Sequence, residues 1–474
     1  MLPDDVLLEI FDICQRNHDR DLHIPSNGVW KWHILVHVCR RWRHITFASP
    51  LRLNLQILCT FGTPVRKSID IWPTFPIVIA YYTSLFPRTL APIDEDNVIA
   101  ALQDPSRVCE VRLGVTGPQL RKIVTVMQET FPAVTQLILW SRNGDVPVLP
   151  GEFLGRSAPC LEDFRLDGIP FPALPVLLPS ASDLITLILT NIPQTGYISP
   201  EAMVAGLATS NRLRELQIGF RWPNSRPDQI RLPVTTRTVL PALTSFRFRG
   251  ACEYLEDFAA RIDAPQLRII AIWYLNQLID FDVPQISRII DHSDALDLRR
   301  PKNCHIQFNR EHVSIRASSG HHKSDFSRLP LSIYVCILCE GIDWQVSHLT
   351  QALSQTSVVT SSMVHLIIHS DIDGRKPTPE DMDDVEWLRL FDLFSSIRTL
   401  SVPKDFAEHV SRLLEVVADG MMATEVLPAL DMLYLGGQSV SSVDKFIAAR
   451  RDSGRPVTLT NSEWEIIEST TIPI

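Results

Sequence analysis

Apolar residues recur along most of this chain in a six-residue motif that is apolar at its first, fourth and sixth positions. Copies begin at Val108, Val134, Leu161, Leu184, Leu213, Leu243, Leu267, Leu331, Met363, Ile397 and Leu430. Neighbouring side chains of a β-strand point to opposite faces, so positions four and six should face a core and positions three and five the opposite surface. The first seven copies start 23 to 30 residues apart, a spacing typical of stacked structural repeats.

Stretches with apolar residues at every third or fourth position separate these motifs and predict helices. They cover residues 118–131, 200–210, 386–397 and 408–422, and several begin at proline, which favours the first helical turn. Two parallel strands need a crossover between them, which is usually a helix. The pattern therefore predicts an α/β fold with a parallel sheet on one face and helices on the other.

The interval between Leu267 and Leu331 departs from this pattern. Its length fits two units, but only Ile306 and Phe308 suggest the missing strand. We expect the polar run 310–328 to form a loop there.

The segment before the motifs also contains apolar runs. Residues 51–58 alternate like a strand, and residues 68–82 hold two extended runs broken at Pro73 and Pro76. A flexible linker would be polar. We expect residues 51–107 to form a divergent first repeat that joins the N-terminus rigidly to the array.

The first fifty residues predict short amphipathic helices. Leu2, Val6, Leu7 and Ile10 have helical spacing and acidic residues take the other side, while a second apolar stripe runs through residues 32–47. So small a segment buries too little surface to be stable alone. Either a partner or the rest of the chain must cover these stripes.

These N-terminal stretches resemble the F-box family, whose pattern opens with Leu-Pro and closes near Cys-Arg-x-Trp. The matching residues are Leu2, Pro3, Val6, Leu7, Ile10, Phe11, Val38, Cys39, Arg40 and Trp42. The resemblance implies that residues 1–50 form a three-helix segment that binds a Skp-type adaptor and, through it, the cullin of a ubiquitin ligase. It implies that all these residues except Arg40 contact the adaptor, while the rest of the chain selects the protein substrate.

The six-residue motif is similar to that of leucine-rich repeats, Leu-x-x-Leu-x-Leu. The asparagine that usually follows is replaced, in three copies by Ile169, Ile192 and Arg221. We therefore expect residues 108–474 to form an irregular leucine-rich-repeat solenoid. A doubly wound enzyme sheet also alternates strands and helices, but its glycine-rich phosphate-binding turn is absent from this sequence.

Composition narrows the choice of partner and compartment. The net charge of -9 and the lack of a concentrated basic surface argue against nucleic acid. The longest apolar run, residues 77–86, is too short to span a membrane, and the N-terminus lacks the pattern of a signal peptide. Nine scattered cysteines fit reduced thiols. We expect a soluble protein of the cytoplasm or nucleus that binds neither nucleic acid nor membrane.

Two sequence features suggest metal sites. Cys336 and Cys339 form a C-x-x-C motif, with Cys304, His305, His321 and His322 nearby in sequence. Residues three apart on a strand point to opposite faces, so we expect buried thiols instead of a zinc or redox site. In the acidic run 371–386, Gly374 directly follows Asp373, which does not match a calcium loop.

No nucleophile elbow, phosphate-binding glycine loop, HExxH helix or kinase motif occurs. We therefore expect no catalytic residues, no metal and no cofactor in this chain.

Positions three and five of the motifs change character along the chain. The early copies place Glu110, Arg112, Asp163, Arg165, Glu215, Gln217, Ser245 and Arg247 there, whereas later copies place Ile269, Ala271, Ile333, Val335, His365, Ile367, Met432 and Tyr434. An apolar row on an open face is either a protein-binding patch or a surface covered by another part of the chain. Under the first alternative, Ile269, Ile333, Val335, Ile367, Met432 and Tyr434 bind the target, with Tyr434 and Ile333 as anchors.

The sequence thus predicts a non-enzymatic substrate-recognition subunit of an SCF-type ubiquitin ligase. One alternative is a repeat-protein scaffold of the same shape without a ligase role. A second alternative, from a different class, is a soluble α/β hydrolase or transferase, which would require converging titratable side chains in a cleft.

Overall fold

The computed structural model describes residues 2–19, 32–49, 53, 55–61, 65–72, 75–81, 90–141, 145–222, 237–275, 283–291, 301–318, 333–355, 357–371, 382–419, 425–437 and 443–460. Contacts divide the chain into two compact units, Met1–Arg221 and Trp222–Ile474. The protein is mixed α/β, and large, mostly parallel sheet structure runs through both units.

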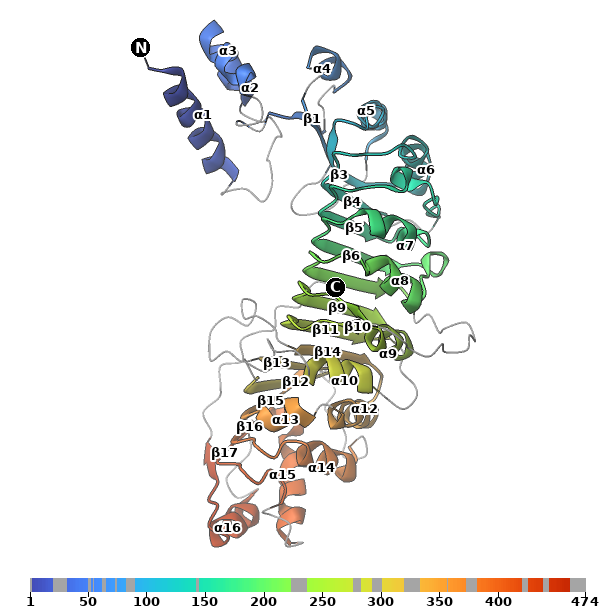
Figure 1. The fold of residues 1–474 in the computed structure, drawn as a ribbon. Helices are drawn as coiled ribbons and strands as arrows, with labels where there is room; N and C mark the ends of the chain where they lie inside the picture. The colour runs from blue at the N-terminus through green and yellow to red at the C-terminus, as the bar shows by residue number, and fades with distance from the viewer. Residues whose placement is uncertain are drawn as a thin grey trace. The chain divides into compact units, whose positions relative to one another are not determined.

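The first unit begins with three helices, α1 (Asp4–Asp19), α2 (Trp32–Val38) and α3 (Arg40–Ala48), and continues as alternating strands and helices (Figure 1). These are β1 (Ile57–Cys59), α4 (Val65–Ile71), β2 (Ile77–Ala80), α5 (Pro92–Leu102), β3 (Val108–Gly114), α6 (Gly117–Val126), β4 (Gln136–Trp140), β5 (Asp163–Asp167), α7 (Leu174–Leu177), β6 (Thr186–Ile192), α8 (Pro200–Leu207) and β7 (Glu215–Phe220). Short 3₁₀ helices lie at Phe153–Arg156, Leu178–Ser180 and Gln194–Gly196. Strands β1 to β7 pair in sequence order, and each pair is parallel.

The second unit continues with β8 (Thr238–Val239), β9 (Ser245–Gly250), α9 (Cys252–Ala260), β10 (Ile262–Asp263), β11 (Ile269–Tyr274), α10 (Pro284–Asp291), β12 (Asn303–Asn309), β13 (His312–Ser318), β14 (Ile333–Leu338), α12 (Ile342–Ser354), α13 (Ser357–Ser362), β15 (His365–Asp371), α14 (Asp384–Asp392), β16 (Thr399–Val402), α15 (Lys404–Asp419), β17 (Met432–Leu435), α16 (Asp444–Asp452) and β18 (Thr458–Thr460). Its main sheet has the order β9-β11-β14-β13-β12-β15-β16-β17-β18, and β8 and β10 form a small separate pair.

The motif strands form as the sequence predicts. A strand begins at the third position of every copy except the first, in which β3 already begins at Val108. In the copy at Leu161, for example, the side chains of Leu161, Phe164 and Leu166 at positions one, four and six are buried. The apolar positions of the motif therefore supply the core between the sheet and the helices, and the predicted helices α6, α8, α14 and α15 are present.

The prediction of a loop at residues 310–328 is wrong for its first half. Residues 312–318 form β13, an antiparallel hairpin with β12, and residues 319–328 lie outside the described part. Apolar side chains alternate along both strands, and Ile306 pairs with Ile315 on the core side. The hairpin sits between β14 and β15, so sheet order there no longer follows sequence order.

The connecting segment is also more helical than predicted. Strands β1 and β2 are present, but the first predicted extended run lies partly in α4, which ends at Ile71 shortly before Pro73. A helix usually ends before a proline, since that ring disfavours helical geometry in the preceding residue. The rings of Trp72 and Phe75 contact Phe47 of α3, with centroids 4.6 Å and 6.0 Å away. These contacts fasten α3 to the segment that follows it.

One turn of the first unit requires glycine. Gly168, directly after β5, has a φ of +69°, and an added Cβ would lie 2.4 Å from the carbonyl oxygen of Ser141. Only glycine adopts this conformation at little cost and allows so close an approach.

Candidate functional site

Helix α1 is held against α3 at its first turn. Asp4 and Asp5 occupy that turn, where carboxylates complement the positive end of the helix dipole. Arg41 of α3 donates a hydrogen bond from Nε to Oδ1 of Asp4 at 2.9 Å, and its guanidinium also donates to the carbonyl oxygen of Leu2. This exposed ion pair orients the start of α1.

The inward face of α1 packs on the other N-terminal helices. Leu7, Leu8 and Phe11 are buried, and the ring of Phe11 contacts Trp42 of α3 at a centroid distance of 4.7 Å. Large apolar side chains buried in this way account for most of the stability of such a small helical segment.

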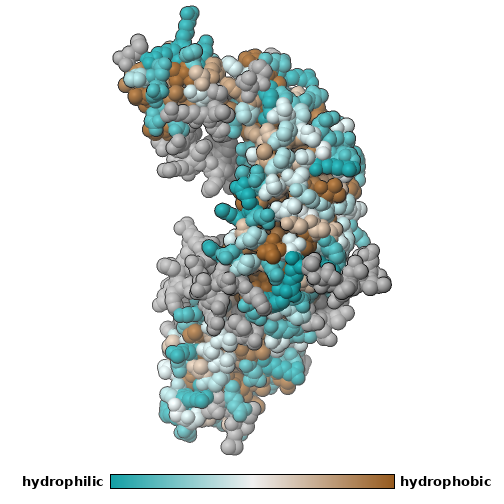
Figure 2. Space-filling view, in the orientation of Figure 1, coloured by the Kyte–Doolittle hydropathy of each residue, from teal (hydrophilic) through white to brown (hydrophobic). Residues whose placement is uncertain are grey.

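A second apolar face of α1 points outward. It consists of Val6, Ile10 and Ile13, which are 42%, 39% and 51% exposed, and it is continued by Leu2, which precedes the helix and is 51% exposed; we refer to these four residues as the α1 stripe. At about 100° per residue, the stripe lies roughly opposite the buried face. Hydrophobic residues are visible on the surface of the N-terminal helices in Figure 2. A helix of a free-standing core normally carries one apolar face, so the second one marks a surface for contact with something else.

The junction of α2 and α3 carries further exposed residues. Val38, the last residue of α2, is 54% exposed, and Cys39 is also exposed. The Sγ atom of Cys39 accepts a hydrogen bond from the backbone N–H of Trp42 at 3.4 Å and so caps α3. Trp42 itself is half-buried against Phe11.

The nine residues predicted to contact an adaptor therefore divide into two groups. Leu2, Pro3, Val6, Ile10, Val38 and Cys39 are exposed, whereas Leu7 and Phe11 are buried and Trp42 is half-buried. The expectation of a single apolar face with Leu7 beside Val6 and Ile10 is wrong, because Leu7 turns inward with Phe11. Ile13, which the motif comparison missed, extends the exposed row by one turn.

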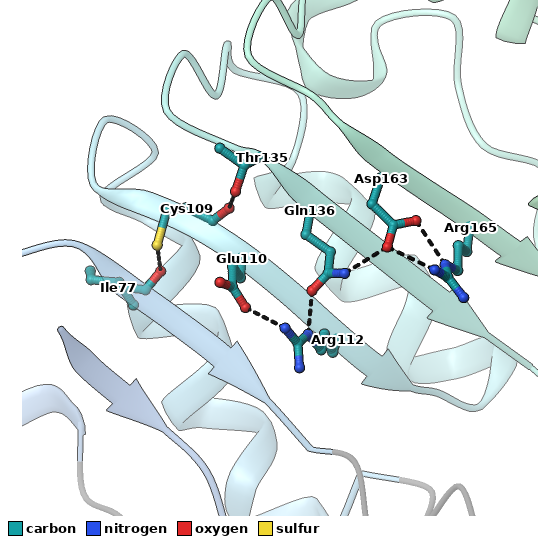
Figure 3. Close-up of polar contacts among 8 residues, drawn as sticks. All are labelled: Ile77, Cys109, Glu110, Arg112, Thr135, Gln136, Asp163 and Arg165. Atoms are coloured by element: carbon teal, nitrogen blue, oxygen red, sulfur yellow. Dashed lines mark hydrogen bonds and ion pairs between the residues drawn. The ribbon is translucent and has the colours of Figure 1, made fainter. Parts of the chain in front are cut away.

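The open sheet face of the first unit carries charges that neutralise one another. Arg112 donates to Glu110 at 2.7 Å and to Gln136, Gln136 donates to Asp163 at 2.7 Å, and Asp163 accepts from Arg165 at 2.7 Å (Figure 3). Two arginines and two carboxylates thus form one continuous ladder across β3, β4 and β5. Each ion pair joins two residues of one strand, and Gln136 links the two pairs across β4, so little charge is left free for a ligand.

The open face of the second unit has a different composition. One row of paired residues runs across it from β9 to β17, namely Arg247, Ala271, Tyr334, Arg316, His305, Ile367, Ser401 and Tyr434. The β12–β13 hairpin supplies His305 and Arg316 at the centre of this row. Polar groups on the hairpin thereby enter a surface that the motif pattern alone predicts to be apolar.

Five side chains on this face form a cluster, which we call the Arg316 cluster. It consists of Trp273, His305, Arg316, Tyr334 and His369. The guanidinium carbon of Arg316 lies 5.8 Å from the centroid of the Tyr334 ring, which in turn lies 5.1 Å from that of Trp273. Nδ1 of His305 and Nε2 of His369 are hydrogen-bonded at 3.1 Å, so one ring donates and the other accepts.

Burial governs the ionisation of this cluster. Burial, with His369 and Arg316 nearby, lowers the pKa of His305 to about 3, and burial with Arg316 lowers the pKa of His369. Burial also raises the pKa of Tyr334 and lowers that of Arg316. The ordinary pKa of an arginine is 12.5, so Arg316 remains charged at neutral pH. The cluster consequently combines one permanent cation with two neutral imidazoles.

The placement predicted for Ile333 and Val335 is wrong. In the β11–β14 register, Ile333 pairs with Ile270 and Val335 with Ile272, both of which face the core. Tyr334 and Cys336 take the open side instead. The run Ile333–Leu338 is apolar on both faces, so the alternation fits two frames, and a shift by one residue exchanges them.

The other four residues predicted to bind a target do lie on the open face. Ile269 and Ile367 are half-buried there, Met432 is 37% exposed, and Tyr434 is half-buried. The hydroxyl of Tyr434 contacts Sδ of Met432 at 3.9 Å. Two residues of this face, Arg316 and Tyr334, were not predicted. The alternation of residues 303–318 could have identified the hairpin that carries Arg316, whereas Tyr334 lies on β14, whose two faces were predicted in the wrong order.

An apolar cavity lies on the core side of the second unit. Its volume is about 40 Å³, and its walls include Ile272, Ile315, Ile333 and Val335 together with residues of α10 and α12. A space of this size holds about one water molecule, and its apolar lining disfavours even that. The cavity is a packing defect of the core and is too small for a ligand.

Of the residues considered for zinc, those that the structure describes form no metal-binding group. Cys336 is buried within β14, Cys339 follows the strand, and burial raises the pKa of these thiols to about 11 and about 12. His321 and His322 lie outside the described residues. In the described part of the chain, no three His, Cys, Asp or Glu side chains are grouped to hold a metal. None of the helices described there is both long and apolar enough to cross a bilayer.

Comparison with known proteins adds no identification. No family model and no curated protein matches this chain. Functional inference therefore rests on the α1 stripe and on the open sheet face of the second unit.

Proposed function

We propose that this protein is a substrate-recognition subunit of an SCF-type ubiquitin ligase. Its N-terminal helices bind a Skp-type adaptor, and its strands present a target protein to the assembled ligase. The chain itself contributes proximity, since it holds a target lysine near the carrier of ubiquitin, and needs no acid, base or metal of its own.

The α1 stripe is the observation that carries this proposal. The large apolar side chains of the stripe stand opposite the buried face of α1, and Val38 and Cys39 are further exposed residues at the junction of α2 and α3. Full burial of a fully exposed side chain of this size yields about 1.5–3 kcal/mol, and each of these side chains, which are about half exposed, would yield roughly half of that in an interface. A row of this kind suits a helical partner that packs its own apolar residues against Val6 and Ile10.

The link between α3 and the first repeat supports the same reading. Phe47 packs on Trp72 and Phe75, so the helices are fastened to the following segment by aromatic contacts. A ligase subunit needs such a connection, because a target must be held at a fixed distance from the site of transfer.

Co-purification with a Skp-type adaptor and a cullin tests the proposal. The full-length tagged protein is expected to retain both, and a Val6→Asp, Ile10→Asp double variant should lose both, because two charges would enter the apolar contact. These positions are preferable to Leu7, whose buried side chain makes Leu7→Asp a folding mutation.

A Val176→Asp, Val416→Asp double variant is the matched control. These valines are 56% and 57% exposed on α7 and α15, so the same change in charge and polarity occurs away from the N-terminal helices. It should bind as the wild type does. Equal retention of adaptor by all three proteins, or its absence from the wild type, would reject the ligase role and favour a scaffold without it.

A further inference from the structure

Among the described residues, Arg316 has no carboxylate partner of the kind that similar arginines have elsewhere on the sheet. In the first unit, Arg112 and Arg165 each bind a carboxylate on their own face. Within the part of the chain that the structure describes, no carboxylate or carbonyl oxygen accepts a hydrogen bond from Arg316, whose guanidinium instead lies against the ring of Tyr334. A half-buried cation without an anionic partner is costly and marks a position where an anion gains most.

The neighbours of Arg316 define the anion further. His305 pairs directly with Arg316 across β12 and β13, and its ring is linked to His369. The guanidinium of Arg316 supplies several N–H donors, and the two neutral imidazoles together have one N–H besides the one in their mutual hydrogen bond. Carboxylate and phosphate oxygens match the planar fork of an arginine.

Apolar and aromatic side chains flank this polar centre on both sides. Trp273 and Tyr334 lie on the β11–β14 side, and Ile367 pairs with His305 on the β15 side. An acidic side chain that reaches Arg316 would therefore have apolar neighbours packed on either side of it. An extended peptide satisfies this arrangement, since alternate side chains point to the same face.

We propose that the Arg316 cluster binds the carboxylate or phosphate group of an acidic side chain within an extended peptide segment of a target protein. This inference rests on the proposed function and assigns the chemistry of the target that the subunit would recruit. A metal is a poorer occupant, because Arg316 stands beside the two imidazoles and no third ligand joins them among the described residues.

Retention of synthetic peptides by the immobilised full-length protein tests the site. Four peptide pools share randomised flanking positions and differ only in a fixed central residue, which is glutamate, phosphoserine, glutamine or lysine. The wild type should retain the glutamate or the phosphoserine pool about tenfold to hundredfold better than the glutamine pool, the range expected for hydrogen bonds to a charged group. Comparison of the two acidic pools distinguishes a carboxylate from a phosphate as the natural group.

Variants at Arg316 make the assignment specific. Arg316→Gln should abolish the preference for acidic peptides, while Arg316→Lys should keep part of it because the point charge remains. Arg112→Gln removes an arginine whose charge is already paired and should bind as the wild type does. Thermal unfolding of each variant is measured first, and a cooperative transition with a midpoint close to that of the wild type shows that the variant is folded.

Two results would overturn the proposal. One is equal retention of acidic and glutamine pools by the wild type, and the other is an undiminished acidic preference in folded Arg316→Gln. The Val6→Asp, Ile10→Asp variant should retain acidic peptides normally. Loss of peptide binding and loss of adaptor binding are therefore separate results, so the Arg316 site and the ligase role can each fail without the other.

Discussion

The neutral His305 makes the stability of the second unit dependent on pH. Its pKa is about 3 in the folded protein, below the ordinary value of 6.5. Such a group contributes its full stability above the unfolded pKa, and the contribution is lost as pH falls below about 6.5, because the unfolded chain then binds a proton that the folded chain does not. About pH 5 is about 1.5 units below the pKa of the imidazole in the unfolded chain, so the free energy of unfolding should fall by about 2 kcal/mol at that pH.

Urea unfolding of the wild type and of His305→Gln at about pH 8 and about pH 5 measures this effect. The wild type should lose about 2 kcal/mol more between the two pH values than the variant, which has no imidazole at this position. Hydrogen–deuterium exchange of β12 and β15 reports opening of the second unit directly. Gln307→Ala, on the same face of β12, removes a side chain that does not titrate and should keep the pH dependence of the wild type.

The absolute stability of His305→Gln does not decide the matter, because the substitution also removes the hydrogen bond to His369. The difference between the two pH values does. If the wild type and His305→Gln lose the same free energy on acidification, then His305 is not held neutral in the folded protein and the reasoning fails.

Three further predictions concern packing and backbone conformation. Ile333→Ala should destabilise the second unit by about 2–5 kcal/mol in urea unfolding, because it enlarges a cavity in the core. Unchanged stability would show that Ile333 lies on the open face instead. Phe11→Ala should cost about 3–5 kcal/mol and speed proteolysis of the N-terminal helices, whereas Ile10→Ala should change stability by less than about 1 kcal/mol, and equal effects would contradict the two-faced α1. Gly168→Ala should lower stability by about 1–3 kcal/mol in thermal unfolding, because its backbone is left-handed and the methyl group meets the carbonyl of Ser141, and an unchanged midpoint would contradict this geometry.

The motif strands could be predicted from the sequence because each one is read from its own residues. In β5, the alternation of Phe164 and Leu166 with Asp163 and Arg165 specifies both the strand and its two faces. The same argument predicted α6, whose first turn begins with Gly117 and Pro118 and is closed by a capping box. Local pattern sufficed wherever one face was apolar and the other polar.

Other features depend on pairing between distant residues and could not be read locally. The two faces of β14 were predicted in the wrong order. Both sets of alternate residues, Ile333, Val335 and Ile337 on one side and Tyr334 and Cys336 on the other, are apolar enough to face the core. The β12–β13 hairpin lacks the motif, and its position between β14 and β15 follows only from the sheet register.

The candidate sites show the same division. The sequence identified Val6 and Ile10 of the α1 stripe, but it did not separate them from Leu7, because a helical period alone does not say which side the partner helix takes. Arg316 and His369 belong to strands far apart in the chain and meet only through the pairing of β13, β12 and β15.

The inserted β12–β13 hairpin has a consequence for how the protein assembles. From β1 to β7 each new strand can add to the one before it, so order can spread stepwise along the chain as it is synthesised. After β11 this is impossible, because β12 has its place three positions away and β14, which fills the adjacent place, comes later in the chain. The second unit must therefore close a long loop before its centre is complete, and this loop closure makes its folding slower than that of the first unit.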